Sequence, residues 1–215
     1  FLAGVPAETD LTAGVTQISA HLLLKGTKNR SAVHIASELE SLGGQLACNA
    51  DAHRYLLGAD VMRGDEAGAL DLIADLILNP MLPQASLADV KKRQIANILE
   101  EQEDPLTVAM RKARREIFAG QPFHRTALGT EQTITKLKLS DCRDMLRASL
   151  TTHNGVISVF GDVQASVVKA QVEKAFAKLV AQNPTTNDAN YLMGLAKLGL
   201  ARGDRIARSE ERRVG

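Results

Sequence analysis

The sequence predicts an α+β fold in which a small antiparallel sheet is covered by several helices. Most of the 215 residues fall into segments whose apolar side chains recur every three or four positions, which is typical of helices. Two short runs instead alternate between apolar and polar residues and are separated by a polar turn, which predicts a hairpin. The segments do not follow the regular strand–helix–strand alternation of a parallel sheet, and this favours α+β.

The first half of the chain is predicted to contain two helices, a hairpin and a third helix. Gly26 can close the first helix in a left-handed conformation, and Ser31 can cap the second, which ends at the glycine pair 43–44. Asp65 can cap the third helix. The predicted elements are helix 12–25, helix 31–42, strands 45–51 and 53–62, and helix 65–78.

The second half is predicted to be mainly helical. Ser86 and Ser140 are candidate N-caps, and Pro105 suits the first turn of a helix. The run "GVISVFGDV", residues 155–163, is short and apolar and predicts a buried strand. The other predicted elements are helix 86–103, helix 105–118, a loop over 119–130, helix 140–150 and helix 163–182.

Composition argues against several classes of protein. Hydrophobic residues make up 45% of the chain, which is the globular norm. The balance of 26 basic and 25 acidic residues, with no Trp and two Tyr, favours neither a nucleic-acid partner nor a stacking platform. No apolar run approaches the roughly 20 residues of a membrane span. Cys48 and Cys142 fit no zinc or redox spacing, and we interpret both as packing thiols.

Several stretches, in this order and spacing, resemble one half-domain of the pitrilysin/insulinase family of zinc metallopeptidases. The resemblance implies the same α+β half-domain, and the amino-acid sequence of these stretches is typical of bacterial members. Active members carry H-x-x-E-H on the first helix and a third ligand, a glutamate, on a later helix. The stretches are "HLLLKGTKNRSAVHIASELESLGGQL", "ALDLIADLILNPMLP", "ILEEQEDP", "PFHRTALGTEQTITKLKLSD" and "NGVISVFGDV".

This sequence departs from that motif at each ligand position but one. Alignment on residues 25–27 places Gln17 at the first histidine, Ala20 at the glutamate that activates water, and His21 at the second histidine. Asn97 falls at the later glutamate. A lone imidazole does not hold zinc, since a tetrahedral site needs three or four protein ligands. The resemblance therefore implies a degenerate site with no catalytic residue and no metal ligands, in which His21 is a half-buried histidine bonded to a neighbour.

In this family two homologous halves enclose a chamber, and commonly only one half carries zinc. The resemblance implies a non-catalytic half that supports proteolysis of peptides or unfolded proteins, as chamber wall and partner interface. Its partners would be a homologous catalytic half, in the same chain or separate, and a peptide substrate in the shared chamber. Zinc is expected only in that partner half, and this chain is expected to be inactive alone.

Two alternatives stay open at this stage. The chain can instead be a structural or binding subunit of a larger complex with no peptidase role, or, less in keeping with its residues, an active peptidase with unusual ligands. An Arg and a Tyr seven positions apart, which commonly reach the scissile carbonyl from the inactive half, would lie beyond this sequence.

We interpret the chain as a fragment. It opens without Met and without a signal-peptide pattern, so both a periplasmic and a cytoplasmic location stay open. Its last eight residues, "RSEERRVG", resemble one frame of a translated sequencing adapter. We expect residues 1–183 to be the first subdomain of the half, residues 184–207 to be a linker or the start of a further segment, and residues 208–215 to be an adapter scar.

Overall fold

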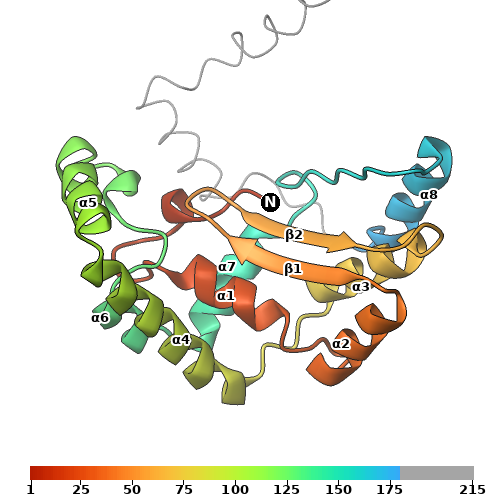
Figure 1. Ribbon diagram of the computed structural model, residues 1–215, viewed down its shortest axis with the longest axis horizontal. Helices are drawn as coiled ribbons and strands as arrows, with labels where there is room; N and C mark the ends of the chain where they lie inside the picture. The colour runs from red at the N-terminus through yellow and green to blue at the C-terminus, as the bar shows by residue number, and fades with distance from the viewer. Residues whose placement is uncertain (180–215) are drawn as a thin grey trace, which may run out of the picture.

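The computed structural model describes residues 1–179, in which a two-stranded hairpin is surrounded by helices (Figure 1). The α+β class predicted from the sequence is confirmed. The predicted linker, the predicted scar and the end of predicted helix 163–182 lie outside the described residues. The elements are 3-10 turns at Val5–Ala7 and Pro122–His124, helices α1 (Val15–Leu23), α2 (Ala32–Ser41), α3 (Glu66–Leu78), α4 (Gln84–Glu103), α5 (Pro105–Ile117), α6 (Glu131–Lys136), α7 (Leu139–Ser149) and α8 (Ala165–Ala175), and strands β1 (Gln45–Ala50) and β2 (Tyr55–Asp60).

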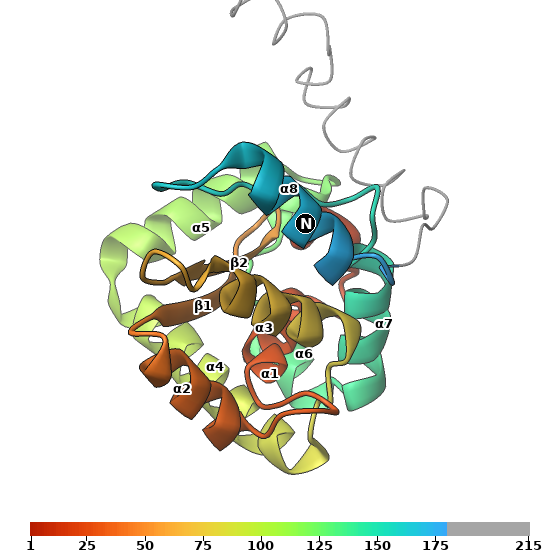
Figure 2. The same cartoon turned by 90° about the vertical axis from the view of Figure 1, so that its right-hand side faces the viewer.

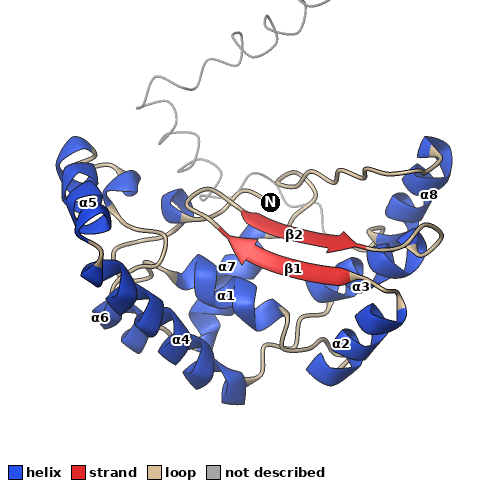
Figure 3. Cartoon of the chain, in the orientation of Figure 1, coloured by secondary structure: helices blue, strands red, loops and turns tan. Residues whose placement is uncertain are grey.

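The predicted hairpin is confirmed and carries its apolar face inward. Strands β1 and β2 are antiparallel, from the pair Ala50–Tyr55 beside the turn to the pair Gln45–Asp60 at the far end (Figure 3). Cys48 and Tyr55 are buried against the helical layer. The Tyr55 hydroxyl shares a hydrogen bond with the hydroxyl of Ser19 on α1, which satisfies two buried polar groups at once.

Helix α1 lies at the centre of the core, in contact with β1, α4 and α7. Its apolar residues Ile18 and Leu22 are fully buried. The first turn of the helix is satisfied by Glu8, whose carboxylate accepts hydrogen bonds from the backbone amides of Gly14 (2.9 Å) and Thr16 (3.0 Å). Burial raises the pKa of Glu8, an effect that the hydrogen bond from the Gly14 amide opposes.

A charged cluster joins α2 to α3. The guanidinium of Arg30 contacts Glu38 of α2 at 2.8 Å, and Asp71 and Asp75 of α3 at 2.7 and 2.8 Å. Burial raises the pKa of Asp75, but hydrogen bonds from Thr27 and its other neighbours outweigh burial, so the pKa lies below its usual value. The ionised carboxylate therefore holds α3 to the turn that precedes α2.

Figure 2 shows α8 lying over α3, which it contacts.

Several predicted helix boundaries are confirmed, and three predicted caps are wrong. Gly26 does not close α1, because the helix ends at Leu23 with Leu24 at the C-cap position. Asp65 occupies the N-cap position of α3 as predicted, but its side chain accepts no capping hydrogen bond.

Ser31 caps α2 by accepting a hydrogen bond from the amide of His34, as predicted. Ser86 lies inside α4, because the helix begins directly after Pro83. The proline ring fixes the φ angle of the residue that precedes the helix. Ser140 lies inside α7, where Asp141 instead accepts a hydrogen bond from the backbone amide of Lys138. The short helix α6 was missed by the sequence analysis.

The prediction of a buried strand at residues 155–163 is wrong for the described part of the chain. These residues pair with no strand of the hairpin, and Val156 and Phe160 are 87% and 92% exposed. An apolar run predicts burial only if a neighbouring element exists to cover it, and nothing in residues 1–179 does so. Within the same range, no helix is both long and apolar enough to cross a bilayer.

A close approach between two turns fixes the start of α1, and it can be tested at one glycine. Gly129 and Gly120 both have positive φ, 75° and 73°. A Cβ on Gly129 would overlap the backbone carbonyl of Ala13, whereas one on Gly120 would meet nothing within 4 Å. We expect Gly120→Ala to cost about 1 kcal/mol of unfolding free energy and Gly129→Ala about 3 kcal/mol or more, measured by urea denaturation. Equal losses would contradict the close approach.

Candidate functional site

The candidate site is the side of α1 that carries Gln17 and His21. Seven of the nine residues of α1 are buried, and the two that are not are these two. They lie one turn apart and so share one face of the helix. Ala20 is fully buried in the core, on a different face. The structure therefore brings two of the predicted positions together and separates the third from them.

The side chain of Gln17 links α1 to the hairpin. Its side-chain amide donates a hydrogen bond to the backbone carbonyl of Ala50, at the end of β1. This bond fixes the hairpin against α1 at the point where the sheet meets the candidate site. An amide is not among the nitrogen, sulfur and carboxylate groups that bind zinc in proteins, so Gln17 supplies no good metal ligand.

His21 is held in an environment that disfavours positive charge. Burial lowers the pKa of its imidazole, and the positive charges of Arg93 and Lys25 lower it further. A hydrogen bond with the backbone of Gln17 opposes these effects only in part. The same positive charges would repel a divalent cation, so the neighbourhood of His21 differs from a zinc site in electrostatics as well as in ligands.

Asn97 is exposed on α4, the helix that packs against α1. The contact between these helices is made one turn earlier, where the buried amide of Gln94 donates to the carbonyls of Gly14 (3.1 Å) and Leu128 (2.7 Å). Arg93 also precedes Asn97 by about one turn. Position 97 therefore lies on the helix where the family resemblance expects a third ligand. It carries an amide instead of a carboxylate, and the positively charged Arg93 precedes it by one turn.

The residues present do not fit zinc. Among residues 1–179, no group of three or more His, Cys, Asp or Glu side chains could hold a metal ion. At the motif positions the donors are one imidazole and two amides, one of which is already bonded to the hairpin. No step of a reaction can be assigned to a metal here.

The sequence analysis missed Arg93 and Gln94. Arg93 lies four residues before Asn97, and helical spacing alone places both on one face of α4, so this residue could have been found. Gln94 could not, because its two partners are backbone carbonyls from distant segments. Both residues matter for the site: Arg93 adds positive charge near His21, and Gln94 bonds α4 to the residue that precedes α1.

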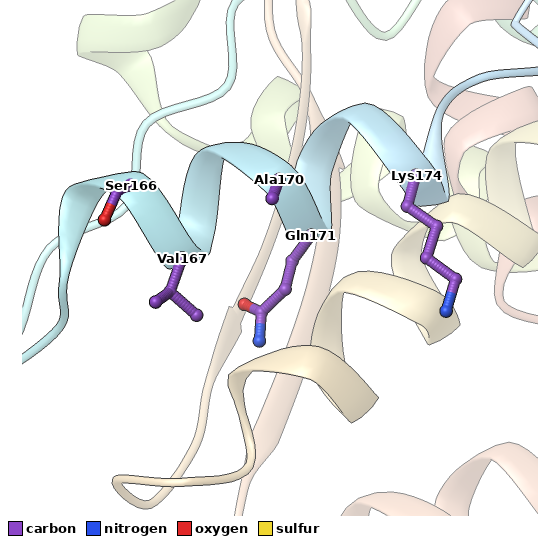
Figure 4. Close-up of a pocket in the computed structure, with 5 residues that line it drawn as sticks. All are labelled: Ser166, Val167, Ala170, Gln171 and Lys174. Carbon is purple, nitrogen blue, oxygen red and sulfur yellow. The ribbon is translucent and has the colours of Figure 1, made fainter.

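Two other concave regions offer no reactive group. An open groove on α8 is lined by Ser166, Val167, Ala170, Gln171 and Lys174 (Figure 4). A cleft of about 850 Å³ between α2, α3 and α8 contains the Arg30 cluster, whose charges are paired with one another. Burial raises the pKa of both Cys48 and Cys142 to about 12, so neither thiol is a nucleophile at neutral pH.

Comparison with known proteins gives a consistent match. The family model described as Insulinase (Peptidase family M16) matches residues 1–131. A probable mitochondrial-processing peptidase subunit beta of Arabidopsis thaliana is 29% identical over 187 residues, covering 86% of this chain and 34% of the relative. The "non-peptidase homolog YmxG" of Helicobacter pylori is 26% identical over 151 residues, 70% of this chain and 35% of the relative.

Solved structures show the same fold. The crystal structure of a peptidase M16 inactive domain from Pseudomonas fluorescens matches with a TM-score of 0.74 at 23% identity, over 85% of this chain and 45% of that one. Pitrilysin matches with a TM-score of 0.73 at 16% identity, over 85% of this chain and 20% of that one. The chain thus spans less than half of the length of these proteins.

The contribution of Arg93 to the lowered pKa of His21, which adds to the larger effect of burial, can be tested by titration. Arg93→Gln removes a nearby positive charge, so we expect the pKa of His21 to rise toward its ordinary value of 6.5, measured by NMR. Arg93→Lys keeps the charge and should leave the pKa low. Since folding lowers this pKa, the contribution of His21 to stability falls as pH drops through 6.5, and less so in Arg93→Gln. An unchanged pKa in Arg93→Gln would contradict the assigned cause.

Proposed function

Because the chain belongs to the insulinase family, peptidase family M16, we propose that it is a non-catalytic half that supports proteolysis by a homologous catalytic half. In this role it forms part of the wall of a shared chamber and part of the interface with its partner. The observation that carries the proposal is the set Gln17, Ala20 and Asn97 at the positions of the ligands and the base. Zinc is assigned only to the partner half.

The packing around Gln17, Ala20 and Asn97 supports a non-catalytic role in a folded protein, as opposed to an enzyme that has lost both its activity and its stability. Helix α1 packs against β1, α4 and α7. The Gln17 side chain bonds to the hairpin, so the replaced residue has a structural use. An inactive half needs a stable fold but no reactive group, and the packing of α1 supports the proposal on the first of these requirements.

Helix α5 offers a surface suited to the partner interface. None of its residues is buried, and Leu106, Met110 and Ile117 form an exposed apolar stripe at helical spacing. Arg114 borders this stripe at helical spacing. Exposed apolar side chains bordered by charge are typical of interaction sites, and the basic border suits an apolar face with acidic residues around it. We assign the homologous catalytic half as the occupant.

The alternative is a structural subunit without a peptidase role, and it is favoured by one observation. A relative that shares 26% identity over 70% of this chain is named a non-peptidase homolog. The two functions differ in what happens after association. A half that supports proteolysis increases cleavage by its partner, whereas a structural subunit binds without any change in cleavage.

The proposal is tested with this chain in its full-length protein and a homologous half that carries an intact H-x-x-E-H motif. We expect no chelator-sensitive cleavage of an unfolded fluorogenic peptide by this chain alone, and cleavage when the two halves are combined. Association without cleavage would favour the structural subunit. Chelator-sensitive cleavage by this chain alone, lost in His21→Ala, would overturn the proposal.

The assignment of the degenerate positions predicts that zinc binding can be restored. The pair Gln17→His and Asn97→Glu would supply, with His21, the three ligands of an open zinc site. We expect about one zinc per chain by elemental analysis in this variant, and far less in the wild type or in Gln17→His alone. Circular dichroism checks folding, because Gln17→His removes the bond to Ala50, worth about 1 kcal/mol. Stoichiometric zinc in the wild type would contradict the assignment.

The stripe on α5 gives a separate prediction about association. Met110→Asp places a charge in the centre of the apolar stripe, so we expect about tenfold or greater weakening of binding to the catalytic half, measured by calorimetry. Val33→Asp, at an apolar position on α2 that is 78% exposed against 61% for Met110, is the matched control and should bind normally. Equal affinities for the two variants would remove α5 from the interface.

A further inference from the structure

Two positively charged side chains lie close to His21. Gln17, His21 and Lys25 follow one another at intervals of four residues, so they lie on one side of α1 and of the turn that follows it. Arg93 comes from α4, which packs against α1. Both cations lower the pKa of the imidazole, so their charges are near it. The side of α1 that is not buried is therefore basic.

The positive charges of Arg93 and Lys25 are not neutralised within the described part of the chain. Among residues 1–179, neither side chain forms an ion pair with a carboxylate. Arg30, by contrast, contacts three carboxylates. The two charged groups that act on His21 are both positive. A negatively charged group is therefore what this side of α1 lacks.

The acidic residues of α4 do not compensate for these charges. Asp89 and Glu100 are exposed on the same helix as Arg93. Glu100 follows Arg93 by seven residues, a rise of about 10 Å along the axis, which exceeds the screening length of about 8 Å at physiological salt. Asp89 precedes Arg93 by four residues, but it does not contribute to the shift of the His21 pKa. The charge beside His21 therefore stays positive.

The same region carries hydrogen-bond donors that suit a carboxylate. The guanidinium of Arg93 is a planar fork of N–H groups that matches the two oxygens of a carboxylate. Asn97 is exposed one turn further along α4, and its side-chain amide supplies another donor. Charge and donor geometry together favour a carboxylate as the ligand.

This basic region is open to solvent. Arg93 and Asn97 are exposed, and neither of the two concave regions described above contains them. A single exposed ion pair contributes little to binding, since water and salt screen it. A small anion would therefore be held weakly. An extended molecule with several carboxylates can add contacts along the surface, and a peptide with acidic side chains has this chemistry.

We propose that the region made of His21, Lys25, Arg93 and Asn97 binds the acidic side chains of an extended peptide. The position that holds a cation in active members of the family would thus receive an anion in this chain. The inference rests on the proposed function for the source of the peptide, which is the substrate in the shared chamber. Binding of the peptide to this chain does not require the catalytic half, so the two proposals can be tested separately.

The experiment measures the binding of two short fluorescent peptides to the full-length protein by anisotropy. One peptide carries glutamates and the other has glutamines at the same positions. At low salt, we expect the glutamate peptide to bind at least about tenfold more tightly, and Arg93→Gln to remove most of this difference. Arg93→Lys keeps the charge and should retain most of it. The matched control is Lys92→Gln, which removes an exposed charge from a different side of α4 and should bind as the wild type does.

The pKa of His21 reports whether the peptide binds at this place. A carboxylate beside the imidazole stabilises its protonated form and raises the pKa. We expect NMR titration to give a higher pKa for His21 with the glutamate peptide than with the glutamine peptide. In Arg93→Gln the two peptides should give the same value. This measurement distinguishes binding beside His21 from binding elsewhere on the protein.

Each other outcome overturns the inference. If the two peptides bind equally, or if Lys92→Gln weakens binding as much as Arg93→Gln, this region does not select acidic side chains. If the glutamate peptide binds without a change in the pKa of His21, it binds elsewhere. If acetate or inorganic phosphate displaces the peptide at the same concentration, the ligand is a small anion and the assignment to a peptide is wrong. A failure of the combined halves to cleave would refute the proposed function and leave these binding measurements unchanged.

Discussion

The burial of helix α1 is the constraint on which the rest of the structure depends. The helix contacts β1, α4 and α7, and the polar groups of its first turn bond to side chains from outside the helix. Glu8 accepts from its first amides, and Gln94 donates to the carbonyl of Gly14. None of these interactions involves a metal ion. The helix is therefore held by packing and by buried hydrogen bonds alone, and a change of ligand residues leaves it in place.

How much of the fold could be predicted from the sequence depended on whether the signal was local. Alternation gave the hairpin, and the cap at Ser31 gave α2, because both depend on neighbouring residues. The caps at Ser86 and Ser140 were wrong because the helices begin earlier, with Pro83 and Lys138 at their N-cap positions, and several residues compete for each start. Helix α6 has six residues, too few for a clear period.

The strand predicted at residues 155–163 fails for a different reason. Its alternation is genuine, but burial is a property of a pair of segments and cannot be inferred from one of them. The candidate site also combines features that local sequence signals predict with features that depend on distant residues. Alignment of local motifs indicated Gln17, Ala20, His21 and Asn97, and helical spacing could have added Arg93. The bond from Gln17 to Ala50 and the two bonds of Gln94 join residues 33 or more positions apart, and no periodicity reports them.

The arrangement explains how a peptidase-like half can lose its chemistry and keep its fold. In α1 the buried residues lie on a different face from Gln17 and His21, whereas Ala20, aligned with the glutamate of active members, is itself buried. A charged glutamate at position 20 would have to be placed in a fully buried position, whereas Ala removes that cost and adds apolar contact. Alanine at this position is thus favourable for stability. Gln17 likewise has a use that needs no metal, because its side-chain amide donates a hydrogen bond to the backbone carbonyl of Ala50.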